Sequence, residues 1–128
     1  MELNLQAKPE THPDIAIAHI NLGSSHYRRG DYGQALLHFQ KSLETALAAY
    51  GEEHKIAYIS YENTALCHIE MGEYDKAIVT LHRAADIKEK TLGSGHPDLA
   101  STFKSIGLAY SKQGKVDRAL NYSKRALN

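Results

Sequence analysis

The stretch that decides the fold is residues 54–93, HKIAYISYENTALCHIEMGEYDKAIVTLHRAADIKEKTLG. Apolar residues recur every three or four positions on both sides of Gly72, a spacing typical of amphipathic helices. Gly72 suits the left-handed backbone that ends a helix, and the apolar pattern restarts at Tyr74. The stretch therefore predicts two helices joined by a tight turn at Gly72, with the second helix ending at Gly93.

The same unit recurs 42 residues away in either direction. Three residue types repeat at that period, at the start of the unit, at its turn and on its second helix: His12, His54 and His96; Gly30, Gly72 and Gly114; Ala35, Ala77 and Ala119. A fixed period is the signature of repeat architectures, in which each unit packs against its neighbours.

We therefore expect one domain over residues 1–128, with repeats at about 12–51, 54–93 and 96–128. Residues 1–10 align with the ends of the second helices. They are either the last turns of a preceding helix or a polar terminus.

Composition bounds the class of protein. The 128 residues carry no formal net charge and are 42% hydrophobic, which is ordinary for a globular domain. Binders of nucleic acid or anionic membranes normally show a basic excess, so we expect neither partner. No apolar run approaches the ~20 residues of a membrane span, and no secretory signal pattern is present. The single cysteine, Cys67, has no partner for an intramolecular disulfide, which favours a cytoplasmic location.

The turns and ends follow from local patterns. Asp31, after the turn glycine, is expected to cap the second helix of the first unit, and Lys115 replaces this acidic residue in the third. The last helix is short and ends at Asn128. Because solenoid ends normally need a polar capping helix, we expect either a longer protein or an end covered by another chain.

The first helix of each unit carries L-G-x-x-[YH] or a variant of it, with Thr64-Ala65 in the second unit and Ile106-Gly107 in the third, and the second helix carries a small residue. Copies of this pattern are Leu22-Gly23…His26 with Ala35…Phe39, and Ile106-Gly107…Tyr110 with Ala119. The pattern resembles the tetratricopeptide repeat, in which small residues allow the two helices to approach closely.

The period of 42 residues exceeds the usual period of about 34. Together with the linker GSGHPDLA at 93–100, it is similar to the kinesin-light-chain subfamily of these repeats. The linker before the second unit departs from this pattern, with Lys55-Ile56 in place of Pro-Asp. The resemblance implies an all-α, right-handed superhelix (α-solenoid) of three antiparallel helix pairs.

The chain has eight histidines, which raises the question of a metal or catalytic site. His12, His54 and His96 start separate repeats, and packed helices lie about 10 Å apart, too far to share one zinc ion. We expect them to cap helices.

Other reactive side chains have structural explanations. His26 and His68 occupy an interhelical packing position, and Cys67 occupies a small-residue position. His19 and His26 share a helix face, but no acidic or cysteine residue is spaced to join them. Phosphate-binding, nucleophile-elbow and zinc-protease motifs are absent from the sequence. We expect no enzymatic activity, no metal and no cofactor.

The resemblance also implies a binding surface, because in this family the first helix of each pair forms a concave wall. The predicted partner-binding residues are Ile17, Ile20, Asn21, Ser24, Tyr27, Arg28, Ile59, Glu62, Asn63, Leu66, Lys104 and Leu108. The other matching positions are Ile69, Glu70, Ser101, Ser105, Ser111 and Lys112. Asn21 and Asn63 are equivalent, and a side-chain amide suits an extended peptide because it both donates and accepts hydrogen bonds.

One subtype of the family holds a chaperone's C-terminal carboxylate in a clamp of lysines, asparagines and an arginine. The matching positions are Ile20, Ser24, Asn63, Ser101 and Ser105, and only Asn63 agrees. Without cations nothing offsets a buried carboxylate, so we expect no such role.

The predicted function is a non-catalytic interaction scaffold for a protein or peptide ligand. One alternative is self-assembly, through the groove or through the ends, where Leu120 and Leu127 at one end and Ile15 and His19 at the other cover a second copy. Another alternative is a peptide-sensing module of a larger bacterial regulator.

Overall fold

A computed structural model describes residues 13–127 of the chain. These residues form six helices: α1 (Pro13–Arg28), α2 (Tyr32–Tyr50), α3 (Lys55–Glu70), α4 (Tyr74–Leu92), α5 (Pro97–Lys112) and α6 (Val116–Leu127). No strand occurs in this part of the chain. Each helix begins 42 residues after its counterpart in the preceding pair. The expectation of a helix end at residues 1–10 lies outside the described residues.

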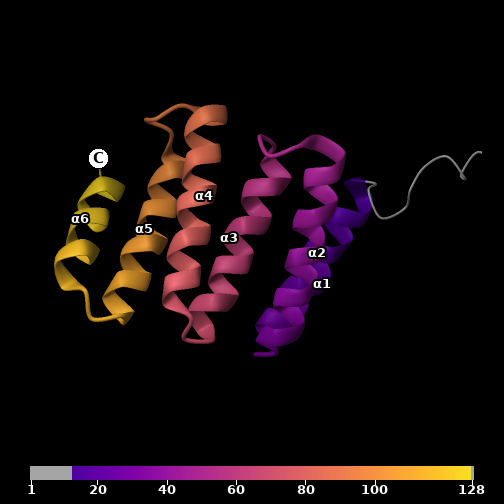
Figure 1. Ribbon diagram of the computed structural model, residues 1–128, viewed down its shortest axis with the longest axis horizontal. Coiled ribbons are helices and arrows are strands. Elements are labelled where there is room, and N and C mark those ends of the chain that lie inside the picture. The colour runs from indigo at the N-terminus through magenta and orange to yellow at the C-terminus, as the bar shows by residue number, and fades with distance from the viewer. Residues whose placement is uncertain (1–12, 128) are drawn as a thin grey trace, which may run out of the picture.

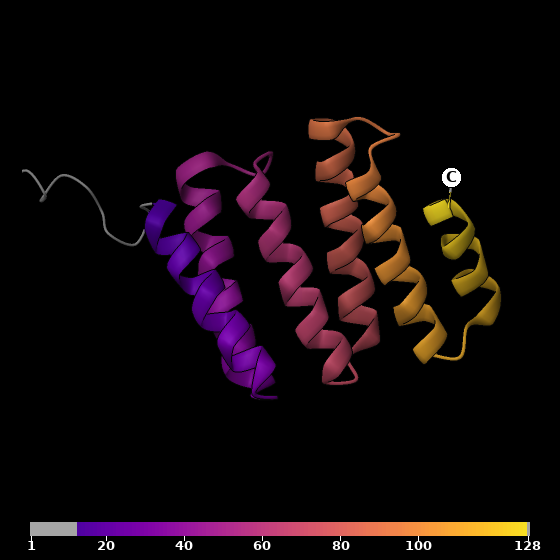
Figure 2. The same ribbon diagram turned by 180° about the vertical axis from the view of Figure 1, so that it is seen from behind.

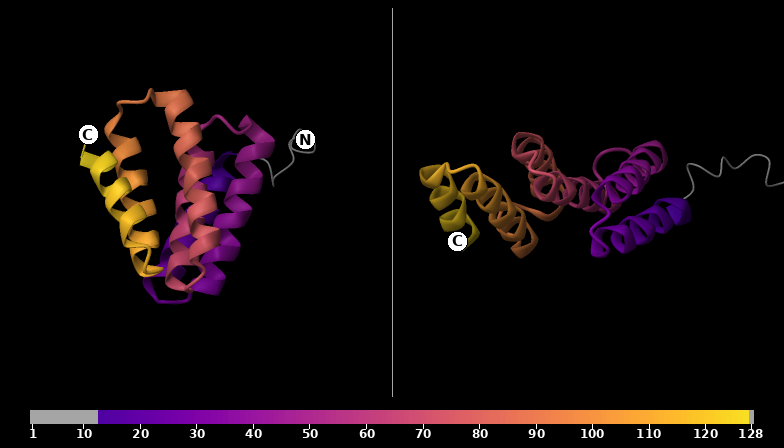
Figure 3. Two further views of the ribbon diagram at one scale, coloured as in Figure 1. Left: turned by 60° about the vertical axis from the view of Figure 1, so that its left-hand side comes forward. Right: turned by 90° about the horizontal axis from the view of Figure 1, so that it is seen from below.

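The helices lie side by side in chain order, and neighbours run antiparallel (Figure 1). From behind, α1 lies in front of α2 (Figure 2). The pairs follow one another along the long axis, with α1 and α2 at one end and α5 and α6 at the other (Figure 3). This arrangement confirms the all-α solenoid of three helix pairs.

Glycines close the turn inside each pair. Gly30, Gly72 and Gly114 have φ angles of 81°, 79° and 83°. This left-handed backbone costs a residue with a Cβ roughly 1–2 kcal/mol, which explains why glycine recurs at this position.

Small residues bring the two helices of a pair together, as the sequence predicts. A Cβ built on Gly23 lies 2.6 Å from the Phe39 ring, and one on Gly107 lies 3.2 Å from the carbonyl oxygen of Ala119. Both distances are shorter than ordinary van der Waals contact. The Phe39 ring therefore occupies the space that a side chain at position 23 would need.

The expectation that Asp31 caps α2 with its side chain is wrong. Asp31 stands at the N-cap position but makes no side-chain cap hydrogen bond, because its backbone (φ −91°, ψ 72°) is not extended as in ordinary caps. Its carboxylate instead lies 3.5 Å from Nδ1 of His26. The second pair repeats this contact, with His68 Nδ1 2.8 Å from Glu73. The acidic residue thus partners the histidine of the preceding helix.

Candidate functional site

Two histidines at helix starts act as caps, as expected. Nδ1 of His54 accepts from the backbone N–H of Ile56, and Nδ1 of His96 accepts from that of Asp98, each at 3.1 Å. These bonds satisfy N–H groups that the helix leaves without partners. His12 lies outside the described residues.

A cluster of histidines joins α1 and α2. His19 Nδ1 lies 3.0 Å from His38 Nδ1, and the His38 ring stacks on the rings of His19 and His26. Burial, and then the charges of the other two histidines, lower the pKa of His38 below its usual value. No pattern in the sequence singles out His38, although it lies on the same predicted helix pair as His19 and His26. Among the described residues no three His, Cys, Asp or Glu side chains are placed to hold a metal ion.

Cys67 is fully buried against Ala35 and Phe39 of α2. Burial raises the pKa of its thiol to about 11, with a smaller contribution from Glu70. The thiol therefore stays protonated at neutral pH, and protonated buried thiols are poor nucleophiles.

Five of the predicted partner-binding residues meet in one pocket. The pocket has a volume of about 320 Å³ and lies between α1 and α3, and its lining comprises Ser24, Tyr27, Arg28, Asn63 and Leu66 together with the buried ring of Phe39 from α2. The sequence pattern predicts only a packing role for Phe39. Its ring lines the pocket because α2 packs against both α1 and α3. The lining thus combines apolar side chains with an amide, two hydroxyls and a guanidinium.

The Tyr27 hydroxyl is already engaged. It donates to Glu70 Oε2 at 3.1 Å. Burial, followed by the negative charge of Glu70, raises the pKa of Tyr27 to about 12. Tyr27 is therefore neutral at physiological pH and offers its ring, and one acceptor lone pair, to the pocket.

Apart from Glu62, the other predicted residues lie in three settings. Lys104 and Leu108 line a second pocket, of about 490 Å³, between α5 and α6. Ile17 and Asn21 are exposed on α1, outside either pocket, whereas Ile20 and Ile59 pack partly against the core.

Ile69 is a correction to the groove set. Its side chain is 4% exposed and belongs to the central core cluster with Leu81 and Ile106. The α5 helix covers it, so it is not available to a ligand.

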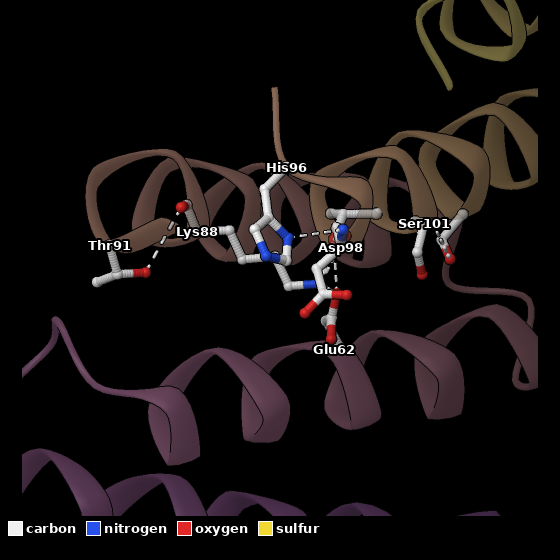
Figure 4. Close-up of polar contacts among 8 residues, drawn as sticks. Glu62, Lys88, Thr91, His96, Asp98 and Ser101 are labelled. Atoms are coloured by element: carbon white, nitrogen blue, oxygen red, sulfur yellow. Dashed lines mark hydrogen bonds and ion pairs between the residues drawn. The ribbon is translucent and has the colours of Figure 1, made fainter. Parts of the chain in front are cut away.

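Glu62 lies in a buried network that the sequence analysis did not foresee. Lys88 Nζ donates to Glu62 Oε2 at 2.5 Å, to the Asp98 carbonyl at 2.9 Å and to Thr102 Oγ1 at 2.8 Å. Thr102 Oγ1 donates in turn to Glu62 Oε2 at 2.6 Å. Figure 4 shows Lys88 reaching from α4 toward Glu62 on α3 and Asp98 on α5. The ammonium also lies 5.2 Å from the centre of the Tyr58 ring. The network joins three helices.

Comparisons with known proteins identify relatives of this architecture. The family model described as tetratricopeptide repeat matches residues 14–78 and 56–128. Among solved structures, BtubC (BKLC) from P. vanneervenii superposes with a TM-score of 0.83 at 25% identity, over 91% of this chain and 47% of that one. The nearly identical repeats of a putative kinesin light chain from Podosopora anserina superpose with a TM-score of 0.78 at 21% identity, over 90% of this chain and 55% of that one.

A third structure, the second repeat domain of Spaghetti (RPAP3) bound to an HSP90 peptide, superposes with a TM-score of 0.67 at 19% identity, over 94% of this chain and 97% of that one. This chain thus spans about half the length of the first of these structures (47%). Among proteins with curated descriptions, none matches the sequence significantly. Of the helices described, none combines the length and the apolar character that crossing a membrane requires.

Proposed function

Because the chain belongs to the tetratricopeptide repeat family, we propose that it is a non-catalytic scaffold that binds a partner peptide along α1, α3 and α5. The observation that carries the proposal is the pocket between α1 and α3, where five of the residues expected from the family's groove meet. A ligand site is normally concave, largely apolar and furnished with a few polar groups that fix orientation. This pocket has that composition.

The chemistry of the lining favours a particular kind of segment. The Phe39 ring and Leu66 suit an aliphatic or aromatic anchor side chain, while Asn63 offers a donor and an acceptor to an extended backbone. Arg28 is exposed at the edge of the pocket, and a guanidinium binds a carboxylate through two parallel hydrogen bonds. The preferred ligand is therefore an apolar anchor followed by an acidic residue.

The site differs from a clamp for a C-terminal carboxylate. We do not expect this chain to bind a peptide like the HSP90 peptide of the Spaghetti (RPAP3) structure, because Ile20, Ser101 and Ser105 stand where the clamp subtype has cationic side chains. The single cation lining the α1/α3 pocket is Arg28. An internal acidic side chain is the better match.

Glu62 has a structural role in this proposal. Its Oε2 atom already accepts from Lys88 and Thr102. Glu62 is therefore not expected to select a ligand, whereas Arg28, Asn63 and Leu66 are.

The test is a fluorescence-polarisation screen of peptides that combine one apolar anchor with flanking acidic or basic residues. Arg28→Ala and Asn63→Ala should each weaken the best acidic ligand by about tenfold, because each removes a side chain that hydrogen-bonds to the ligand and such a bond contributes about 1.4 kcal/mol. Arg29→Ala is the matched control, because Arg29 is a neighbouring exposed arginine that does not line the pocket. Equal losses for Arg28→Ala and Arg29→Ala would reduce the effect to general charge attraction and contradict the proposed site.

A further inference from the structure

Helices α5 and α6 form a surface equivalent to those that the first two helix pairs form and that the next helix of the chain covers. Every residue lining the pocket of about 490 Å³ belongs to one of these two helices. Its apolar members include Val116 and Leu120, which are 61% and 55% exposed. The equivalent surface of α1 and α2 is covered by α3, and that of α4 by α5. We call the α5/α6 surface the receiving face.

The helices that cover the two internal surfaces do so with one stripe of small or apolar residues. On α3 the stripe is Ala57, Ser60, Thr64 and Cys67, and all four are buried. On α5 the residues 42 positions later are Leu99, Thr102, Ile106 and Ala109, and all four are buried as well. No charged residue occupies the stripe in either helix.

Helix α1 carries the same stripe without a cover among the described residues. The positions 42 residues before the α3 stripe are Ile15, Ala18, Leu22 and Ser25, again uncharged and either small or apolar. Ala18, Leu22 and Ser25 are exposed, and Leu22 is 47% exposed. We call these four residues the α1 stripe.

The receiving face and the α1 stripe fit each other in the manner of the internal interfaces. Leu120 corresponds to Ile78, and Leu22 corresponds to Ile106, two residues that share the central core cluster. Ser123 lines the receiving face where the other pairs have the bulky Phe39 and Leu81. The smaller side chain leaves room on the receiving face for the larger Leu22, which stands where α3 has a threonine.

We propose that a second copy of this chain covers the receiving face, docking its α1 stripe onto α5 and α6 as α3 docks onto α2 within one chain. A second copy is the favoured occupant for two reasons. The same kind of interface already occurs twice inside the molecule, between α2 and α3 and between α4 and α5. The chain also exposes both surfaces that such an interface needs, the α1 stripe and the receiving face. The two halves are different surfaces at opposite ends of the long axis (Figure 3). Contact between unlike surfaces leaves one of each free, so the copies form an open chain that grows with concentration.

The experiment measures solution mass by sedimentation velocity and light scattering over a concentration series that reaches about 1 mM. The wild-type mass should rise steadily with concentration. Leu22→Glu and Leu120→Glu should each be monomeric, because each places a charge in one half of the interface. Both side chains are about half exposed in the monomer, so both variants should melt like the wild type by circular dichroism at a dilute concentration where the wild type is also monomeric.

Mixing the two variants gives the decisive result. In an equimolar mixture the intact receiving face of the Leu22→Glu chain meets the intact stripe of the Leu120→Glu chain, and the mass should stop at a 1:1 dimer. Val79→Glu is the control, since Val79 is 70% exposed on the central helix α4, and it should assemble like the wild type. A wild type that stays monomeric, a mixture that stays monomeric, or single variants that still assemble would each overturn the proposal.

Discussion

Glu62→Gln should destabilise the protein more than removal of its partner, Lys88→Met. The two side chains differ in their access to water, since that of Lys88 is 4% exposed and that of Glu62 is 25% exposed. Glutamine keeps the shape of Glu62 and one acceptor but removes the negative charge. The Lys88 ammonium then remains buried, with only the Asp98 carbonyl, the Thr102 hydroxyl and an amide oxygen around it.

The magnitudes follow from this asymmetry. A buried charge stripped of its partner typically costs about 3–5 kcal/mol of stability. Because glutamine retains one acceptor, we expect Glu62→Gln to lower the free energy of unfolding by about 3 kcal/mol. Methionine fills the volume of Lys88 with an apolar side chain, and Glu62 keeps both its access to water and the Thr102 hydroxyl. Lys88→Met should therefore cost about 1 kcal/mol, and the double variant should recover much of the loss seen in Glu62→Gln.

Urea unfolding followed by circular dichroism measures these differences through linear extrapolation. The exposed pair Lys90–Glu53, 3.8 Å apart with both side chains more than half exposed, is the control, and Glu53→Gln should change stability by no more than about 0.5 kcal/mol. If Lys88→Met cost as much as Glu62→Gln, the argument that the buried ammonium depends on its counter-charge would be refuted.

Three further predictions concern packing, pH and reactivity. Gly23→Ala should lower the free energy of unfolding by about 1–2 kcal/mol, because the 2.6 Å approach of its Cβ to Phe39 outweighs the gain in helix propensity; a stabilised variant in urea unfolding would contradict this. Since the pKa of His38 is lowered on folding, its contribution to stability is present above about pH 6.5 and is lost as the pH falls below that value, so His38→Asn should flatten the fall in melting temperature between about pH 7 and pH 5. Cys67, buried and with a pKa of about 11, should react with a thiol reagent at about pH 8 only in the unfolded state, and rapid labelling of the native protein would count against this account.

Several features were predictable because they depend on neighbours in the sequence. The period of 42 residues placed the helices of all three pairs, and the positive φ angles of Gly30, Gly72 and Gly114 follow from the position of glycine between two amphipathic patterns. The capping role of His54 and His96 was also predictable, since a cap bonds within three residues of itself. Each of these features depends on residues only a few positions apart, so one sequence is enough to predict it.

The candidate site was predictable only in part. The family pattern put Tyr27, Arg28 and Asn63 on the same surface, and the structure brings them to one pocket. The pattern assigned Glu62 to the same surface, but a lysine 26 residues away and a threonine 40 residues away hold its carboxylate. The sequence alone does not reveal which long side chain crosses between helices.

The sequence by itself determined the repeat, the helix pairs and the turns, because hydrophobic periodicity and glycine act over a few residues. The tertiary structure alone decided that Asp31 meets His26 instead of capping α2, that Lys88 is buried, and that Leu22 on α1 and Leu120 on α6 stay about half exposed. Each of these depends on how closely two helices pack and which side chains then meet. The distances between helices are set when the helix pairs stack, and a pattern of neighbouring residues does not predict them.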